Sequence, residues 1–562
     1  MIIKKYIKYC LAILTVVVLL LPLLQDYVFK FKIKELYGVL FWTPKPEMTF
    51  QTVYSGHYQT NIEKYISETF GFREPTIRFY NQYLWDFYKK TPVEYVVQGK
   101  DGWLYFIQNV NEYYGTEIYR WYDTSDEARK VFERRARIMN KLRLVLQDYG
   151  IEFLVFEAPE KGFLYSEYLP ERKRDTTSIS ATEFYTEKFN EYGFPFIGMT
   201  AYYKQLKEIT DYPLFTKYGF HWDISCVYGA DTLLRTMESL TGNNMPHLYL
   251  TNFHPYDVND IENHKIDFDI EQNLNLLRPM EYGEGQTPLM ADVIIETDSS
   301  CFKPKMFFIG DSFMWRIHDL VDFHQVFGDS RFWYYNSTAY YGDNITKMRP
   351  ASDFDQLREI FKSDFIVLFS HGSQIHKFSY GFAEKALLDL CVPDSIMNRE
   401  IKRVSDSAKV SLTAAKELII SNPELIPELR GEAVPTIRNT RRVAIAKTMN
   451  RIEEDDVWMK SLKVQAAIES APIDSVIRHE AINIIDGKPL LLDNITMSDS
   501  LLGQYDTLLY QYEINAIIES MKLNPMLMDE IRHKAKKNGI TFEEQLQKDA
   551  EWIWDYQTNN PQ

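Results

Sequence analysis

The alternation of apolar runs and polar turns predicts an α/β arrangement in the middle of the chain. Four short, mostly apolar runs predict buried strands, and they lie between stretches whose apolar residues recur at helical spacing. The runs are 153–156, 307–309, 332–335 and 365–369. Alternating strands and helices favour a mainly parallel sheet covered by helices. We therefore expect an α/β fold over residues 96–388.

The two ends of the chain follow other patterns. Residues 1–30 contain an apolar run from Leu11 to Leu24 behind several lysines, which predicts an uncleaved signal anchor with one N-terminal transmembrane helix. The leading lysines favour an orientation with the bulk of the chain outside the cytoplasm. The expected location is the inner membrane, single-pass, with the catalytic domain in the periplasm or otherwise outside the cytoplasm.

Helical periodicity dominates on both sides of the α/β region. Residues 31–95 predict a helical juxtamembrane region, and residues 389–562 predict an all-α C-terminal domain. Similar segments recur in the C-terminal domain, so it is either an array of degenerate helical repeats or an ordinary helical domain with chance matches. An array of this kind would bind a protein partner or pack on its own catalytic domain.

The strongest candidate for chemistry is the turn Gly310-Asp311-Ser312. A predicted strand runs directly into this turn and a predicted helix follows it. A serine in such a turn exposes its hydroxyl beside the backbone N–H groups of a helix N-terminus, which can bind developing negative charge. The carboxyl ends of neighbouring parallel strands share one edge of a sheet. Asn336, after the next strand, is therefore either an oxyanion donor or a turn residue.

A serine nucleophile needs a base, and His221 is the best placed of the eleven histidines. It lies between Phe220 and Trp222, just ahead of a predicted helix, and it is either this base or a packed histidine beside a buried tryptophan. His371 and His376 follow the last strand and are expected to be solvent-exposed loop histidines. Because cysteine and carboxylate ligands are missing beside them, no metal site and no cofactor are expected.

These residues carry a resemblance to a known family. The His-Trp segment followed by Gly-Asp-Ser-Phe resembles the SGNH-type bacterial exopolysaccharide O-acetyltransferases, especially the alginate O-acetylation proteins. Segments 98–105 and 158–170 are similar to the family in the same order. The resemblance implies that Ser312 carries an acetyl group and that His221 is its base. The residues that would support this site are Asp311, Gly310, Asn336 and Trp222.

The resemblance also implies partners. The acetyl group would come from a membrane-bound O-acyltransferase, and the acceptor would be a cell-surface polysaccharide. In one respect the chain departs from the family, which carries an aspartate two residues before the histidine, where this chain has Gly219. The chain therefore uses a Ser-His dyad, has a carboxylate from a distant part of the sequence beside the histidine, or is an inactive member of the fold. Asp223 is the nearest acid in sequence.

Charge and composition narrow the function further. The formal net charge of −16 argues against nucleic acid as a partner. Aromatic residues make up 15% of the chain, which suits either sugar-stacking surfaces or an aromatic-rich core. Residues 243–300 show weak periodicity and predict an elaborated loop region that shapes an acceptor cleft.

Three functions remain open at this point. The first is a membrane-anchored, extracytoplasmic O-acetyltransferase with an acetyl-serine intermediate. The second is a catalytically inactive scaffold or carbohydrate-binding component of a polysaccharide modification complex. The third is a carbohydrate acetylesterase, in which water replaces the polysaccharide hydroxyl as the acceptor.

Overall fold

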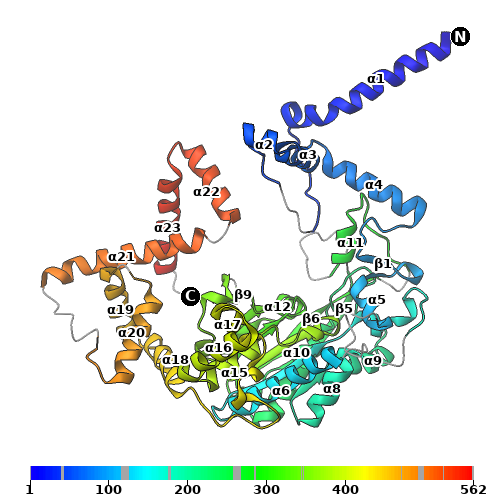
Figure 1. Ribbon diagram of the computed structural model, residues 1–562. Coiled ribbons are helices and arrows are strands. Elements are labelled where there is room, and N and C mark those ends of the chain that lie inside the picture. Colours follow the sequence, from blue (N-terminus) through cyan, green and yellow to red (C-terminus); the bar gives the residue numbers. More distant parts are fainter. Residues whose placement is uncertain are drawn as a thin grey trace.

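The computed structural model describes most of the 562-residue chain. Its description leaves out residues 1, 39–42, 116–125, 175–178, 257–266, 284–286, 343, 344, 346, 470, 491–498, 523, 524 and 560–562. Figure 1 shows an α/β body with the first four helices at one end and a helical region at the other. The sequence also predicts Ser125 as the N-cap of a helix that runs to about Tyr149, and Ser125 lies outside the described residues.

A seven-stranded mixed sheet forms the centre of the α/β body. Its strand order is β10-β9-β8-β7-β11-β3-β4. The five strands from β8 to β4 are parallel, whereas β9 and β10 pair antiparallel at one edge. The expectation of a mainly parallel sheet is corrected at this edge, because short turns connect β8, β9 and β10 and reverse the chain direction. The strands are β3 (Glu152–Ala158), β4 (Phe196–Gly198), β7 (Lys305–Gly310), β8 (Asp329–Tyr334), β9 (Thr338–Tyr341), β10 (Lys347–Pro350) and β11 (Phe365–His371).

Two smaller antiparallel pairs lie outside this sheet. They are β1 (Val96–Gln98) with β2 (Leu104–Phe106), and β5 (His247–Pro255) with β6 (Leu289–Glu296). The second pair lies in the stretch 243–300, where loops were expected. The prediction of an unbroken loop region was therefore wrong for the strand residues at its two ends.

The central strands are buried on both faces because helices cover both. Successive residues point to opposite faces, so Phe308 packs into one core and Phe307 into the other. The core around Phe308 includes residues of α10 and α12, and the core around Phe307 includes residues of α6, α8 and α15. The helices of the body are α5 (Ile107–Tyr114), α6 (Asp126–Gln147), α7 (Lys161–Leu164), α8 (Ala181–Glu191), α9 (Met199–Ile209), α10 (Cys226–Thr241), α11 (Asp269–Leu274), α12 (Phe313–Leu320), α13 (Phe323–Val326), α14 (Gln356–Phe361) and α15 (Phe382–Cys391).

The core around Phe307 continues past residue 388. It takes in Val404, Ala415 and Val443 from the helices that follow, whereas the helices beyond them have two small cores of their own. The helices after residue 391 are α16 (Asp394–Ala408), α17 (Leu412–Ser421), α18 (Thr440–Glu453), α19 (Asp456–Glu469), α20 (Ile473–Asp486), α21 (Asp499–Lys522), α22 (Pro525–Asn538) and α23 (Phe542–Asn559). The first part of the helical region therefore shares its core with the sheet.

The helices before the α/β body are α1 (Ile2–Leu24), α2 (Phe50–Tyr54), α3 (His57–Thr69) and α4 (Arg73–Tyr88). The break between α3 and α4 falls at Phe70-Gly71-Phe72. Across the described residues, no helix has both the length and the apolar character needed to cross a bilayer. Figure 1 shows α1 extending away from the body.

Candidate active site

The turn after β7 holds Ser312 at the start of α12, as the sequence predicts. Gly310 ends the strand where β7 and β11 approach closely, and a Cβ atom there would lie 2.2 Å from the carbonyl oxygen of Phe369. Only glycine fits this contact. Asp311 is fully buried, and its Oδ1 accepts the backbone N–H of Phe313 at 3.1 Å. These contacts fix the backbone on both sides of Ser312.

A second histidine lies beneath this turn. His371 Nδ1 is 2.7 Å from Asp311 Oδ2, which also accepts the His371 backbone N–H at 2.8 Å. The expectation that His371 is a solvent-exposed loop residue was wrong, because β11 continues through it and its side chain is only 1% exposed. His376 is half-buried. Burial alone raises the pKa of Asp311, but His371 outweighs it and holds this pKa below its usual range.

The structure brings His221 to Ser312. The imidazole Nε2 lies 2.8 Å from Ser312 Oγ, within hydrogen-bonding distance. Trp222 is fully buried, and its indole N–H donates to the Phe313 carbonyl at 3.0 Å. Trp222 therefore ties the histidine loop to the serine turn, although the two lie 91 residues apart. The 2.8 Å between His221 Nε2 and Ser312 Oγ is the distance expected between a nucleophile and its base.

Lys161 holds the histidine loop from behind. Its ammonium donates to the carbonyl oxygens of Gly219 at 2.6 Å, Leu104 at 2.8 Å and Lys217 at 3.2 Å. The side chain is completely buried, and burial lowers its pKa to about 7 although Asp267 and Asp269 act in the opposite direction. Three acceptors around one ammonium fix the path of the chain into His221.

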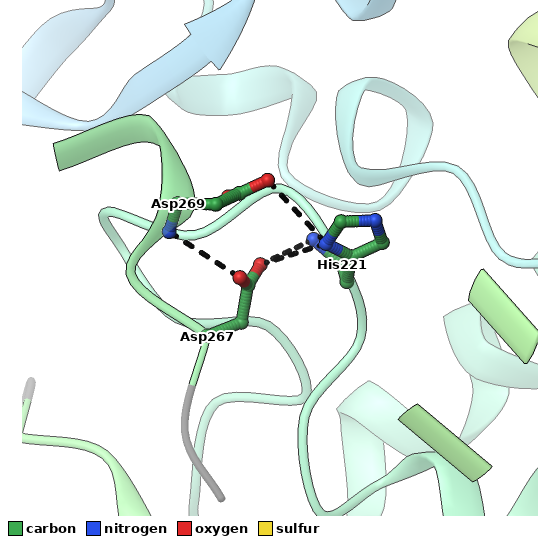
Figure 2. Close-up of side chains that lie close together, drawn as sticks. All are labelled: His221, Asp267 and Asp269. Atoms are coloured by element: carbon green, nitrogen blue, oxygen red, sulfur yellow. Dashed lines mark hydrogen bonds and ion pairs between the residues drawn. The ribbon is translucent and has the colours of Figure 1, made fainter. Parts of the chain in front are cut away.

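Two carboxylates face the other nitrogen of the imidazole. Asp267 Oδ2 and Asp269 Oδ2 each lie 3.4 Å from His221 Nδ1, and Figure 2 shows both pointing at this atom. Asp267 Oδ2 also accepts the backbone N–H of His221 at 2.6 Å and of Phe220 at 2.7 Å. The carboxylates therefore fix both the ring and the backbone that carries it.

Asp267 fills the space beside Gly219. A Cβ atom on Gly219 would lie 2.3 Å from the Asp267 carbonyl oxygen and 2.3 Å from Thr216 Oγ1. A side chain at position 219 and Asp267 in its present place exclude each other. The sequence left three alternatives: a Ser-His dyad, a carboxylate from a distant part of the chain, or an inactive site. This geometry corresponds to the distant carboxylate. Asp223, the nearest acid in sequence, is not the carboxylate that faces His221, because it pairs with Arg316 at 3.2 Å.

The negative charges of Asp267 and Asp269 determine the direction in which the pKa of His221 shifts. Burial alone lowers the pKa of His221, but the negative charges of Asp267 and Asp269 outweigh it, and the pKa is raised. The pKa of Asp267 is lowered, because His221 and the backbone N–H groups overcome the effect of burial. Burial and the neighbouring Asp267 raise the pKa of Asp269. Asp267 is therefore the ionised partner that stabilises the imidazolium.

The same trio has the composition of a metal site. His221, Asp267 and Asp269 each offer one ligand atom, and these atoms lie within 4.8 Å of one another. We expect no metal here, because Asp267 Oδ2 already accepts two backbone N–H groups and the other ring nitrogen faces Ser312. The absence of a metal stays a prediction, and a chelator tests it.

The strand after the serine helix adds one more group. Asn336 was expected as an oxyanion donor or a turn residue, and its amide N–H donates to the Tyr380 carbonyl at 3.1 Å. It therefore braces the turn. Burial and the charge of Asp311 raise the pKa of the neighbouring Tyr335, while hydrogen bonding to Ser312 opposes this shift. The Tyr335 hydroxyl thus lies beside the serine.

Sequence reasoning missed Asp267, Asp269, Tyr335 and the role of Lys161. The one available signal for the carboxylates was the run Ile266-Asp267-Phe268-Asp269-Ile270, in which acidic and apolar residues alternate. This run lies in a stretch without strong periodicity, so nothing local connected it with a histidine 46 residues earlier.

A protein-family comparison agrees with this geometry. Residues 96–247 match the family model described as the SGNH hydrolase-like domain of acetyltransferase AlgX. Residues 96–247 of the chain therefore resemble the SGNH hydrolase-like domain of this acetyltransferase family. The match includes His221 and ends before Ser312. No match to a curated protein sequence was found.

Three solved structures each match about half of this chain. The O-acetyltransferase domain of Pseudomonas putida AlgJ is 13% identical, with a TM-score of 0.32, over 50% of this chain and 92% of that one. Pseudomonas aeruginosa AlgX is 14% identical, with a TM-score of 0.32, over 52% and 68%. Bacillus cereus PatB1 is 13% identical, with a TM-score of 0.30, over 50% and 96%. These similarities are low, and the resemblance to the family rests on the match over residues 96–247.

Proposed function

We propose that the protein is an O-acetyltransferase that transfers acetyl groups to a cell-surface polysaccharide through an acetyl-Ser312 intermediate. The observation that carries this proposal is the chain of contacts from Ser312 Oγ through both nitrogens of His221 to the buried Asp267 and Asp269. An inactive scaffold has no need of this alignment. A serine, an imidazole and a carboxylate in this order are the parts of a nucleophilic acyl-transfer site.

In the first half of the reaction, His221 Nε2 takes the proton of Ser312 as Oγ attacks the carbonyl carbon of an acetyl ester. The oxygen of the tetrahedral intermediate becomes negative, and the Ser312 backbone N–H at the start of α12 is the donor placed to stabilise it. The intermediate collapses, the donor alcohol leaves with the proton from His221, and acetyl-Ser312 remains.

In the second half, a polysaccharide hydroxyl takes the place of the donor alcohol. His221 removes its proton, the hydroxyl oxygen attacks the acetyl carbon, and Ser312 leaves with the proton returned by His221. Asp267 stabilises the imidazolium in both halves. If water attacks instead, the product is free acetate, so transferase and esterase differ only in the acceptor.

The setting of this reaction is also part of the proposal. The apolar run from Leu11 to Leu24 anchors the chain to the inner membrane, with the α/β body in the periplasm. A membrane-bound O-acyltransferase supplies the acetyl group there. The α/β body would then work on polysaccharide that has already left the cytoplasm.

The test is to capture the intermediate. The full chain is incubated with p-nitrophenyl acetate and analysed by mass spectrometry of its peptides. We expect acetylation on the peptide that contains Ser312, release of p-nitrophenol, and loss of both in Ser312→Ala. Activity that persists in a chelator would agree with the expected absence of a metal.

The controls separate the outcomes. His221→Ala should also abolish the adduct, whereas Ser337→Ala, an exposed hydroxyl in a neighbouring turn, should leave it unchanged. An adduct that forms equally in Ser312→Ala, or no adduct and no turnover in the parent protein, would rule out the acyl-serine mechanism.

A further inference from the structure

Helix α4 turns its polar side toward the protein. Asn81 and Gln82 are the two residues of α4 that are buried. The Asn81 amide donates to the Leu274 carbonyl at 2.8 Å, and Gln82 Oε1 accepts the Arg278 backbone N–H at 3.2 Å. Asp86 forms an ion pair with Arg278 at 2.7 Å. Trp85 of α4 also packs against the core around Phe308. Hydrogen bonds, an ion pair and one aromatic side chain therefore fix α4 on the body.

The opposite side of α4 is aromatic and exposed. Phe79, Tyr83 and Phe87 are spaced four residues apart, which places them on one stripe of a helix, and Tyr80 lies beside them. Their exposed fractions are 66%, 42%, 74% and 58% for Phe79, Tyr83, Phe87 and Tyr80. We call these four residues the aromatic face. A helix between protein and water normally shows the reverse pattern, and contiguous exposed apolar patches mark interaction sites.

The charges around the aromatic face identify its partner. None of its four residues is charged, and the helix ends in Phe87-Tyr88 followed by Lys89 and Lys90, which are both exposed. Aromatic rings with adjacent lysines suit the headgroup region of a bilayer, where rings lie below the phosphates and ammonium groups beside them. Residues 30–95 contain nine basic and seven acidic residues, although the whole chain carries −16.

The neighbouring helices also carry exposed apolar side chains. Phe50 and Tyr54 of α2 stack on each other and are 88% and 85% exposed. In α1, the side chains of Ile13, Leu14 and Val18 are also more than half exposed. Figure 1 shows α1, α2 and α4 at the same end of the molecule, away from the C-terminal helices. The exposed apolar residues of the N-terminal region are therefore gathered at one end.

We propose that the aromatic face of α4 lies in the headgroup region of a lipid bilayer that contains anionic lipid. This contact would hold the α/β body at a fixed height and tilt above the membrane. It is separate from any anchoring by α1, and it does not depend on acyl transfer. The partner is a lipid surface and not a protein, because the four residues of the aromatic face carry no charge that a protein partner could pair with, and exposed lysines follow at the end of the helix.

The test measures the depth of single probes in the full chain. Cys10 and Cys301 are replaced by serine, and Phe79→Cys and Phe87→Cys are each labelled with an environment-sensitive fluorophore. The protein is reconstituted in vesicles of phosphatidylethanolamine and phosphatidylglycerol. We expect blue-shifted emission and at least twofold quenching by nitroxides placed near the lipid headgroup, with weaker quenching by nitroxides deep in the acyl chains.

The matched control is Ile209→Cys at the end of α9, an apolar position that is 81% exposed but lies on the α/β body. We expect no quenching there. Lys89→Glu together with Lys90→Glu should reduce quenching at position 87 more in vesicles with phosphatidylglycerol than in neutral vesicles. Probes at 79 and 87 that stay in water while the protein floats with the vesicles would overturn the proposal. A blue shift that depends on protein concentration and not on lipid would overturn it as well, because it would indicate contact with a second copy.

Discussion

The imidazole of His221 is held at both nitrogens, with Ser312 on one side and two carboxylates on the other. The carboxylates come from Asp267, 46 residues further along the chain, and from Asp269 at the start of α11, and not from the position two residues before the histidine. At the residue scale, Gly219 at that position therefore makes room for carboxylates from elsewhere in the chain, and these orient the imidazole of His221.

Gly219→Asp should lower activity. The new side chain would have to occupy the space of the Asp267 carbonyl and of Thr216 Oγ1, so the loop must move. A displacement of about 1 Å at a catalytic group can cost about 10²-fold in rate. We expect a loss of this order in kcat/KM with p-nitrophenyl acetate, together with a lower Tm. Gly219→Ala should show a smaller loss, and a rise in activity for Gly219→Asp would contradict the assignment of Asp267.

Asp267→Asn should lower kcat and shift the pH profile. The base must be neutral to accept a proton, and the charge of Asp267 raises the pKa of His221. Without that charge the pKa falls, so the acid limb of kcat/KM moves to lower pH, while kcat falls by as much as about 10⁴-fold. Asp269→Asn should have the smaller effect, because the raised pKa of Asp269 makes it the less ionised partner. Equal losses in the two variants would show that both carboxylates are needed as charges.

His371 connects the two halves of the site. Its ring stacks on Phe313 at 4.5 Å and lies edge-on to Phe220 at 5.2 Å, and these residues adjoin Ser312 and His221. His371→Phe keeps the ring but leaves Asp311 without its side-chain donor, and His371→Asn keeps a donor but loses the ring. We expect a lower kcat with little change in KM for both variants. A change in KM alone would contradict this positioning role.

At the scale of elements, the strand-turn-helix unit from β7 to α12 follows from local sequence. An apolar run, a Gly-Asp-Ser turn and helical spacing specify it without reference to the rest of the chain. The loop that carries His221 is different, because it has no regular structure of its own. The buried Lys161, the Trp222 indole and Asp267 hold it in place.

Lys161→Met should loosen this loop. Three buried carbonyls would lose their donor, and each unsatisfied polar group costs about 1–3 kcal/mol. We expect a clear loss of stability in denaturant unfolding and a lower kcat. Lys204→Met, at an exposed position on α9, should change neither.

The pH dependence of stability gives a second readout of Lys161. Its pKa is about 7 in the folded protein and about 10.4 in an unfolded chain. Between these values the unfolded state binds more protons, so this group makes the protein more stable as pH rises. In Lys161→Met the free energy of unfolding should rise less steeply with pH between these two values. An unchanged pH dependence would contradict the lowered pKa of Lys161.

At the scale of the whole molecule, the helical region is not one separate unit. The core around Phe307 runs through Val404 and Val443, and Lys141 of α6 pairs with Glu424 at 3.0 Å. The later helices form their own small cores. The expected boundary at residue 388 therefore cuts through a continuous core.

Two shortened chains should behave differently. A chain that stops after Lys488 keeps the core around Phe307 intact, so we expect normal Ser312 acetylation and a Tm close to that of the full chain. A chain that stops after Pro393 exposes buried residues of α15 such as Leu387 and Leu390 to water. We expect it to aggregate or to unfold at a much lower temperature. Normal acetylation and Tm in the shorter chain would show that the later helices are dispensable.

The sequence by itself determined four of the seven strands of the central sheet, the turn that carries Ser312, and the choice of His221 as the histidine that lies beside it. These features depend on periodicity and on short motifs, which are local and can be read along the chain. The prediction of exposed loops around His371 failed because burial is decided by what packs from elsewhere.

Only the tertiary structure decided which acid serves His221. Asp267 and Asp269 lie in a stretch without clear periodicity, and their role arises from a contact between two distant loops. Only the tertiary structure likewise showed the antiparallel edge of the central sheet and the outward orientation of the aromatic face of α4. A residue's partners across long sequence separations depend on the packing of whole elements, and no local pattern records that packing.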